Sequence, residues 1–341
     1  MFIDEKAVTG RLESIREENN IAGMAVGVTN SKSVLYSSGF GVESVERPEV
    51  KVETNSLFKI ASITKMVTGI TVMKLVEKGL LDLDTPVKKY VPWLKLSRPE
   101  AEDKMALRHL LSHSSGLSGK IIYNCPKDER YLEQTLKEIL PGLEMNTLPG
   151  DGVFLYSNYG FVLASYIAQS VTGRTWSELA TDTVLKPLGM DRTFYDINVV
   201  CTYNIALPHI ENEKGELIVK HKLASEATRF GSGEIFSNVT DLCKLLRFFM
   251  NRGVTDRSER LLSEESVRMM TSRQVKRDDN DYHGFAVHIR RFGGRYIYGH
   301  TGWMPPYRAS LYFDPDKDIG VIVLLNTDRD EIRNDILSMF L

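Results

Sequence analysis

The chain has 341 residues, of which 42% are hydrophobic and 26% are charged, a balance typical of a globular protein with a large buried core. Its net charge of −2 at pH 7 gives no general attraction to nucleic acid or to an anionic membrane, so we expect neither as a partner. No apolar run approaches the ~20 residues of a membrane-spanning helix.

The N-terminus and the cysteines bear on the cellular compartment. Residues 1–6 become polar almost at once and lack the apolar core of a signal peptide, and the first residue is Met1. Cys125, Cys201 and Cys243 are odd in number and far apart, which argues against a disulfide framework. We therefore expect a cytoplasmic protein.

In chain order, the first predicted elements are a helix, a hairpin and a second helix. An apolar stripe predicts a helix over residues 4–19, and two alternating runs at 22–28 and 33–40 predict a β-hairpin. An extended apolar run at 57–60 then leads into a helical pattern that stops at Gly79, a residue typical of the position after a helix end.

The later parts of the chain differ in their patterns. Residues 81–224 begin with a proline-rich crossing and are then mostly helical, with helices predicted at 131–140, 159–171 and 176–185. Further helices are predicted at 242–250, 263–270 and 330–341. Strands are predicted at 285–291, 295–298, 308–313 and 319–325. Turns of hairpin length separate these strands, so we expect them to be antiparallel.

These elements predict an α+β fold in which an antiparallel sheet is flanked by helices. We expect one unit over residues 1–341, with strands from both ends of the chain in the same sheet. An α/β lobe would comprise about 1–80 and 225–341, and a mostly helical lobe about 81–224.

The most informative stretch is the serine and lysine at the start of the second helix. Ser62 follows the extended run, and Lys65 lies three residues later, so both side chains share one helix face. A serine hydroxyl needs a neighbouring base and donors for the oxyanion when it attacks a carbonyl. The lysine supplies a base, and the N–H groups at the helix start supply part of an oxyanion site.

The pattern Ser-x-x-Lys is weak by itself, because serine is also an ordinary helix-capping residue. It occurs a second time, at Ser56 and Lys59. Ser56 is the poorer candidate because it precedes an extended run, in which residues three apart point to opposite faces.

Other motifs accompany Ser62 in a fixed order. Tyr156-Ser157-Asn158 is the one Tyr-x-Asn in the chain, and His300-Thr301-Gly302 is the one triplet of the His/Lys-Thr/Ser-Gly type. With these motifs the chain resembles the penicillin-recognising serine hydrolases, which include class C β-lactamases, D-alanyl-D-alanine carboxypeptidases, D-aminopeptidases and β-lactamase-like esterases. The likeness extends over roughly 10–326 and includes further family-like segments at 110–117, 149–150, 171–173, 187–190, 231–241 and 298–303.

The resemblance implies roles for individual residues. Ser62 would be the nucleophile, with Lys65 and Tyr156 as the proton-transfer pair. We expect the Tyr156 anion to be favoured by Lys65 and His300 nearby. The resemblance assigns substrate binding to Asn158, to His300, Thr301 and Gly302, and to Trp303, whose backbone N–H would be an oxyanion donor.

Three substrate classes remain open for such a hydrolase: small esters or amides, D-amino-acid peptides and β-lactams. The bulky segment 303–307 disfavours large β-lactam side chains, and the missing signal peptide disfavours work on the cell wall, so we favour small esters or amides. A non-catalytic scaffold or binding relative is an alternative of another class, although such a relative should have lost one of Ser62, Lys65 or Tyr156.

Metal and cofactor sites are not predicted. His109 and His113 are four residues apart and would share a helix face, but the sequence offers no obvious third ligand and no HExxH glutamate. The sequence also contains no G-x-S-x-G elbow and no dinucleotide-binding G-x-G-x-x-G. The expected partner is a small-molecule or short-peptide substrate, and the sequence leaves the oligomeric state open.

Overall fold

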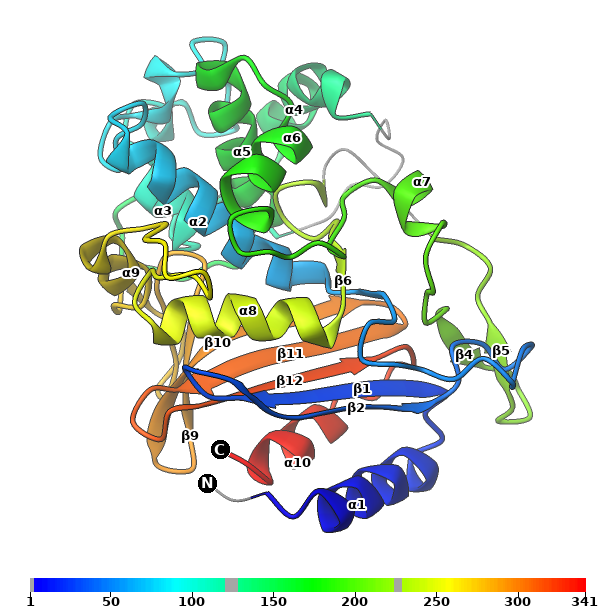
Figure 1. Cartoon of the computed structure of the whole chain (residues 1–341). Coiled ribbons are helices and arrows are strands. Elements are labelled where there is room, and N and C mark those ends of the chain that lie inside the picture. Colours follow the sequence, from blue (N-terminus) through cyan, green and yellow to red (C-terminus); the bar gives the residue numbers. More distant parts are fainter. Residues whose placement is uncertain (1–2, 120–127, 224–228) are drawn as a thin grey trace.

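One large antiparallel sheet organises the structure, a computed structural model that describes residues 3–119, 128–223 and 229–341 (Figure 1). Within these residues the sheet has eight strands in the order β2-β1-β12-β11-β10-β9-β8-β7. They are β1 (Gly23–Thr29), β2 (Val34–Gly41), β7 (Val275–Lys276), β8 (Tyr282–His283), β9 (His288–Phe292), β10 (Arg295–Met304), β11 (Tyr307–Asp314) and β12 (Ile319–Leu325). The predicted α+β class and the joining of N- and C-terminal strands in one sheet are confirmed, since β1 pairs with β12.

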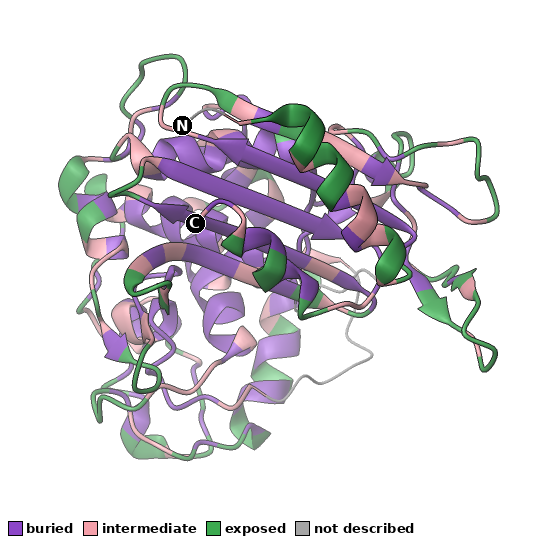
Figure 2. Cartoon of the chain, turned by 90° about the horizontal axis from the view of Figure 1, so that it is seen from below, coloured by how far each residue is buried: buried purple, intermediate pink, exposed green. Residues whose placement is uncertain are grey.

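Helices cover both faces of this sheet (Figures 1 and 2). The helices are α1 (Glu5–Glu18), α2 (Thr64–Glu77), α3 (Leu107–Leu111), α4 (Leu132–Ile139), α5 (Asn158–Thr172), α6 (Trp176–Ala180), α7 (Ile197–Val200), α8 (Val239–Met250), α9 (Glu264–Met270) and α10 (Ile332–Ser338). In Figure 1, α1 and α10 lie beneath the sheet, and α8 and α2 lie above it.

The alternation of side chains along β12 explains why its sequence is apolar throughout. Ile322 and Leu324 belong to the core above the sheet, whereas Val321 and Val323 belong to the core beneath it. Because successive residues of a strand point to opposite faces, a strand covered on both sides needs apolar residues at every position. The fold therefore has two cores that share one sheet.

Two of the predicted strands differ from the observed ones. The first begins at His288 rather than at 285, because the N–H groups of Phe285 and Ala286 donate to Met270 and Leu111 instead of to a neighbouring strand. The second extends to Met304 rather than to 298, so it carries the whole His300 triplet.

Several short elements carry too few residues for periodicity to predict them. They include β3 (Phe58–Lys59) paired with β6 (Phe236–Ser237), and β4 (His209–Glu211) paired with β5 (Leu217–Val219). The β4–β5 hairpin lies within 81–224 and projects to the side in Figure 1. The division of the chain into lobes at about 81 and 224 stays a prediction.

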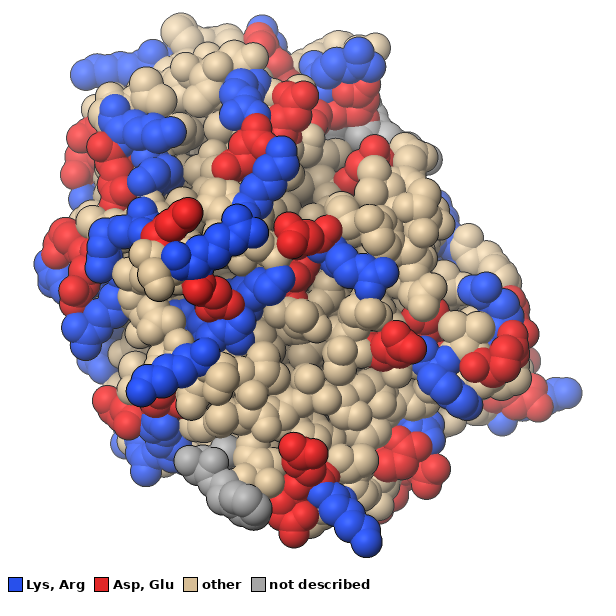
Figure 3. Space-filling view, in the orientation of Figure 1, with Lys and Arg blue, Asp and Glu red and all other residues tan. Residues whose placement is uncertain are grey.

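The surface is mixed in charge. Lys and Arg alternate with Asp and Glu over the face shown in Figure 3, in keeping with the small net charge. Cys201 and Cys243 are free thiols, and Cys125 lies outside the described residues. In the part of the chain that is described, none of the helices has both the length and the apolar character of a membrane span.

Candidate active site

The backbone before α2 presents Ser62 next to strands β10 and β11 of the sheet. The short β3–β6 pairing continues into a hydrogen bond from Ile60 N–H to the carbonyl of Ile235, 3.0 Å. Ala61 then takes a left-handed conformation, φ +47°, which is uncommon for a residue with a side chain and is often found at functional sites. Ser62 lies in the 3₁₀ turn Ala61–Ile63 that leads directly into α2, so it is close to the helix start as predicted.

Lys65 lies one turn further along and is completely buried. Its Nζ is 3.2 Å from Ser62 Oγ, 2.7 Å from Asn158 Oδ1 and 2.7 Å from the carbonyl oxygen of Ser232. Burial lowers the pKa of Lys65 well below its ordinary value of 10.5, because the ammonium loses its hydration. A neutral amine at this position can accept a proton from the Ser62 hydroxyl.

Tyr156 approaches Ser62 from the other side. Its hydroxyl donates to Ser62 Oγ over 2.8 Å. Burial raises the pKa of Tyr156 above its ordinary value of 10.0, although the hydrogen bond with Ser62 and the charge of Arg277 partly oppose the rise. The expectation that the Tyr156 anion is favoured is therefore wrong, because burial of the phenol, which no local sequence pattern encodes, outweighs the nearby charges. Tyr156 is a neutral proton donor at pH 7.

Strand β10 brings the second motif against the nucleophile segment. A Cβ placed on Gly302 would lie 2.1 Å from the carbonyl oxygen of Ile60, so only glycine allows the two backbones to approach this closely. Thr301 and Trp303 line the cavity beside Ser62. The indole of Trp303 is 56% exposed, and its Nε1 lies 3.4 Å from Asp328 Oδ2.

His300 is buried next to this cavity and is neutral. Burial lowers the pKa of His300 from 6.5 to about 3, and the protonated form of Lys65 adds to this shift. Its Nδ1 lies 2.6 Å from the carbonyl oxygen of Thr301, so the ring proton is on Nδ1 and donates there. His300 therefore contributes no positive charge between pH 6 and 8.

Two more histidines, from distant parts of the sequence, meet His300. In the described part of the chain, His113, His283 and His300 form the one group whose metal-ligand atoms lie mutually within 4.8 Å. His113 also stacks on the ring of Tyr156, with centroids 4.2 Å apart, and its Nδ1 accepts the N–H of Ser157, 3.0 Å. His113 thus holds the segment that carries Tyr156.

The three histidines do not fit a zinc site. A zinc ligand offers a lone pair on one ring nitrogen while the other nitrogen donates a hydrogen bond. In neutral His113 one nitrogen accepts from Ser157 and the other carries the proton, so neither offers a free lone pair. His109, the partner considered for His113 from the sequence, is not in this group of histidines, and its Nδ1 accepts from Ala106 N–H at the start of α3.

The serine and the lysine of the second Ser-x-x-Lys motif each bind another side chain. Ser56 is fully buried and donates to a carboxylate oxygen of Glu43, 2.5 Å. Lys59 is 3.1 Å from Glu234 in a buried ion pair. The side chains of Ser56 and Lys59 thus have structural partners, and the cavities described below are lined by Ser62 instead.

Two cavities meet at Ser62 and Asn158. One of about 380 Å³ is lined by Ser62, Gly119, Tyr156, Asn158, Arg277, His283, His288, His300, Thr301 and Trp303. The other, about 50 Å³, is lined by Ala61, Ser62, Asn158, Tyr159, Arg229, Ser232, Gly233, Trp303 and Met304. Of these residues, the sequence motifs did not single out His283, His288 or Arg277, which the fold brings here from other parts of the chain.

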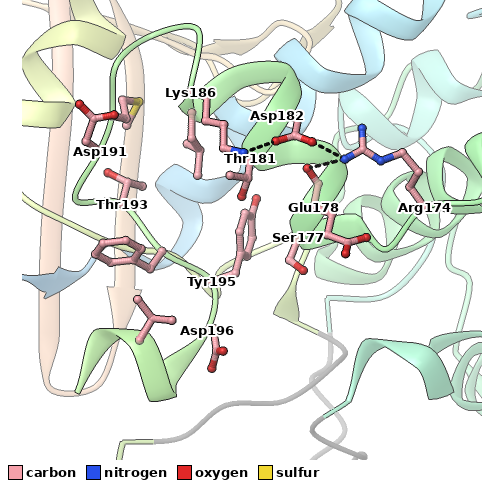
Figure 4. Close-up of a pocket in the computed structure, with 14 residues that line it drawn as sticks. Arg174, Ser177, Glu178, Thr181, Asp182, Lys186, Asp191, Thr193, Tyr195 and Asp196 are labelled. Carbon is pink, nitrogen blue, oxygen red and sulfur yellow. Dashed lines mark hydrogen bonds and ion pairs between the residues drawn. The ribbon is translucent and has the colours of Figure 1, made fainter. Parts of the chain in front are cut away.

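A larger cavity of about 580 Å³ lies away from Ser62, between α6 and α7 (Figure 4). Three charged side chains that line this cavity pair with one another, since Asp182 forms ion pairs with both Arg174 and Lys186. None of the residues predicted for the active site lines it. A choice of active site by cavity volume alone would therefore select this cavity and not the one that is lined by Ser62 and Tyr156.

Known proteins are similar to this chain over most of its length. Residues 8–337 match the sequence model of the family described as Beta-lactamase. Protein flp of Staphylococcus aureus strain MW2 is 24% identical over 325 residues, which cover 94% of this chain but only 63% of flp. Penicillin-binding protein 4 of Amycolatopsis lactamdurans is 26% identical over 76% of this chain and 68% of its own length.

Solved structures of penicillin-binding proteins have the same fold as this chain. The octameric penicillin-binding protein homologue of Pyrococcus abyssi superposes with a TM-score of 0.84 at 26% identity, over 99% of this chain and 77% of its own. The penicillin-binding protein of Bacillus halodurans gives a TM-score of 0.80 at 25% identity, over 96% of this chain and 99% of its own. The resemblance inferred from the motifs is confirmed.

The close approach at Gly302 gives a first prediction. Gly302→Ala should lower kcat for hydrolysis of a p-nitrophenyl ester at least ~10-fold, because the new Cβ pushes β10 away from the backbone at Ile60 and disturbs the reacting geometry. Gly142→Ala is the matched control, since a Cβ there meets nothing within 4 Å. A Gly302→Ala enzyme with the kcat of the wild type would contradict the prediction.

The buried imidazoles predict acid sensitivity. Burial lowers the pKa of His283 well below 6.5, so below pH 6.5 the unfolded chain takes up a proton that the folded protein excludes. The free energy of unfolding should then fall by up to about 1.4 kcal/mol per pH unit for this group.

The test is urea unfolding of the wild type and of His283→Gln at pH 7.5 and 5.5. The loss of stability between the two pH values should be about 1 kcal/mol smaller in His283→Gln. Equal losses in His283→Gln and the wild type would show that His283 is not kept neutral by the fold.

Proposed function

The chain belongs to the Beta-lactamase family, and from this and the geometry at Ser62 we propose that it is a serine hydrolase that acts through an acyl-enzyme on small esters or amides. The observation that carries the proposal is the contact of one hydroxyl with two proton-transfer groups. Lys65 Nζ lies 3.2 Å from Ser62 Oγ, and Tyr156 OH lies 2.8 Å from it. This is the arrangement of a nucleophile, a base and an acid.

In the proposed acylation step, neutral Lys65 accepts the Ser62 proton while Ser62 Oγ attacks the substrate carbonyl. The backbone N–H groups of Ser62 and Trp303 would hold the oxyanion, and the side-chain amide of Asn158 would hold the substrate oxygen. Tyr156 protonates the leaving alcohol or amine, and the proton on Lys65 restores the phenol. Water then attacks the acyl-enzyme by the reverse path, which releases the acid and regenerates Ser62.

A second candidate is a D-amino-acid peptidase that also binds penicillin. The names of the relatives support it, because penicillin-binding proteins appear both among the similar sequences and among the similar structures. Neutral His300 counts against a substrate carboxylate being held at that position. A non-catalytic binding protein is the least supported function, since the reacting groups of Ser62, Lys65 and Tyr156 are all in contact.

The nucleophile is tested by substitution and mass spectrometry. Ser62→Ala should lower kcat for p-nitrophenyl butyrate by at least ~10³-fold and abolish the covalent adduct with a fluorescent penicillin. Its thermal midpoint should stay near that of the wild type, because Ser62 is only half-buried. Ser56→Ala is the control, and it should keep the adduct on Ser62. Normal turnover in Ser62→Ala would overturn the assignment.

The proton-transfer pair is tested by a double-mutant cycle. Lys65→Ala and Tyr156→Phe should each lower the acylation rate by ~10²–10⁴-fold, and the double variant should be little worse than either, because the two groups act as one unit. Stopped-flow acylation by p-nitrophenyl butyrate gives all three rates. A double variant whose loss equals the product of the two single losses would show that Lys65 and Tyr156 act independently.

A further inference from the structure

One aromatic side chain beside the nucleophile is open to solvent. In the part of the chain that the structure describes, Trp303 is the most exposed of the large hydrophobic side chains, at 56%. Of the described residues, Ser62, Asn158 and Trp303 are the three that line both cavities at the active site, the one of about 380 Å³ and the one of about 50 Å³. A single exposed apolar side chain is ordinary on a protein surface. Trp303 differs because it adjoins the nucleophile and because its ring is held in one orientation.

Two neighbouring side chains hold this ring. Arg308 is the cross-strand partner of Trp303 on β11, and its guanidinium carbon lies 4.7 Å from the centre of the indole ring. The indole Nε1 donates to Asp328 Oδ2 over 3.4 Å, and Asp328 Oδ1 also accepts from Arg308 Nε, 2.5 Å. The indole is therefore fixed at one face and at one edge, so it loses little conformational freedom when a ligand binds.

The other face of the indole is matched to an aromatic group. Arg308 covers one face of the ring, so the exposed part of Trp303 is the opposite face and the outer edge. Such a face attracts either a cation or a second aromatic ring. None of the described residues that line the 380 Å³ cavity is an aspartate or a glutamate, so a cation bound there would meet no opposite charge. A neutral aromatic ring is therefore the better match.

The sizes of the two cavities decide where such a ring is bound. A protein cavity of about 150 Å³ holds a benzene molecule. The 50 Å³ cavity is too small for a ring, whereas the 380 Å³ cavity has room for a ring and for the atoms that link it to the scissile bond. Trp303 lines this second cavity, so a ring bound there can stack on the free face of the indole.

The position of Tyr156 decides which part of the substrate carries the ring. The leaving group must lie within hydrogen-bond reach of the group that protonates it. In the proposed mechanism that group is Tyr156, whose side chain lines the 380 Å³ cavity but not the 50 Å³ cavity. The aromatic ring therefore belongs to the leaving alcohol or amine and not to the acyl group.

We propose that the alcohol or amine released by this enzyme carries an aromatic ring, which stacks on the free face of Trp303 before the bond breaks. This rests on the proposed function. The bond from the acyl carbon to the leaving oxygen or nitrogen breaks, a bond from that carbon to Ser62 Oγ forms, and Tyr156 supplies the proton to the leaving group. Water then takes the acyl group from Ser62 and replaces the proton, so no other reactant is needed.

The kinetic test compares benzyl acetate with cyclohexylmethyl acetate. Both esters have the same acyl group and release a primary alcohol with a six-membered ring, and only the benzyl ring is aromatic and planar. The quantity measured is kcat/KM for benzyl acetate divided by kcat/KM for cyclohexylmethyl acetate. This ratio should fall about fivefold in Trp303→Leu, which keeps an apolar side chain but loses the aromatic face, and Trp303→Phe should keep most of it.

The use of a ratio separates stacking from a general loss of activity. Every variant at position 303 keeps the backbone N–H that is proposed to hold the oxyanion, and any disturbance of that group affects both esters alike. The matched control is Tyr131→Leu, at an aromatic side chain that is 53% exposed and lines neither cavity, and it should leave the ratio unchanged. A Trp303→Leu enzyme with the ratio of the wild type would overturn the proposal.

Binding is tested without turnover in Ser62→Ala, which keeps the native Trp303. The indole N–H signal of Trp303 is followed by ¹⁵N NMR and assigned by its loss in Trp303→Phe. Benzyl acetate should move this proton signal upfield through its ring current, and cyclohexylmethyl acetate should not. Equal displacements by the two esters would contradict stacking on Trp303. Failure of the proposed function is a separate result, because hydrolysis of the esters would then persist in Ser62→Ala.

Discussion

A lysine without access to water is the constraint on which the rest of the site depends. Lys65 is fully buried, and a buried ammonium is stable only when its hydrogen-bonding capacity is met by nearby acceptors. The acceptors come from three separate segments: Ser62 before α2, Asn158 at the start of α5, and the carbonyl of Ser232. The same burial that makes the charged form costly makes the neutral amine accessible, and the neutral amine is the form that can remove a proton from Ser62.

The sheet and its short accessory pairings hold these segments in register. The β3–β6 pair fixes the backbone before Ser62, and β10 lies against the same backbone because Gly302 has no side chain. His113 fixes the third segment, since it bonds to Ser157 and stacks on Tyr156. Each reacting group is therefore supported by regular structure or by a buried ring, which is the arrangement that keeps catalytic distances constant.

Much of this arrangement follows from the sequence. Periodicity predicts the N-terminal hairpin, the long helices and the late strands, and the order of the motifs predicts that Ser62, Lys65, Tyr156 and Asn158 share a site. What the sequence does not contain is the environment of each group: the depth at which Tyr156 and His300 are buried sets their protonation, and no local pattern encodes depth. Arg277 and His283 carry no motif and reach the site only because β7 and β8 lie at the edge of the sheet. The strand expected from residue 285 begins at 288, because the N–H groups of Phe285 and Ala286 donate to Met270 and Leu111 and not to a neighbouring strand.

The most direct test of the account is the titration of Lys65 itself. The ¹³Cε and ¹Hε signals of labelled lysine can be followed from pH 6 to 11, with the Lys65 signal assigned by its loss in Lys65→Ala. We expect Lys65 to titrate well below the ordinary lysine pKa of 10.5, because its burial disfavours the ammonium. A Lys65 that stays protonated up to pH 10.5 or beyond would contradict its role as the base for Ser62.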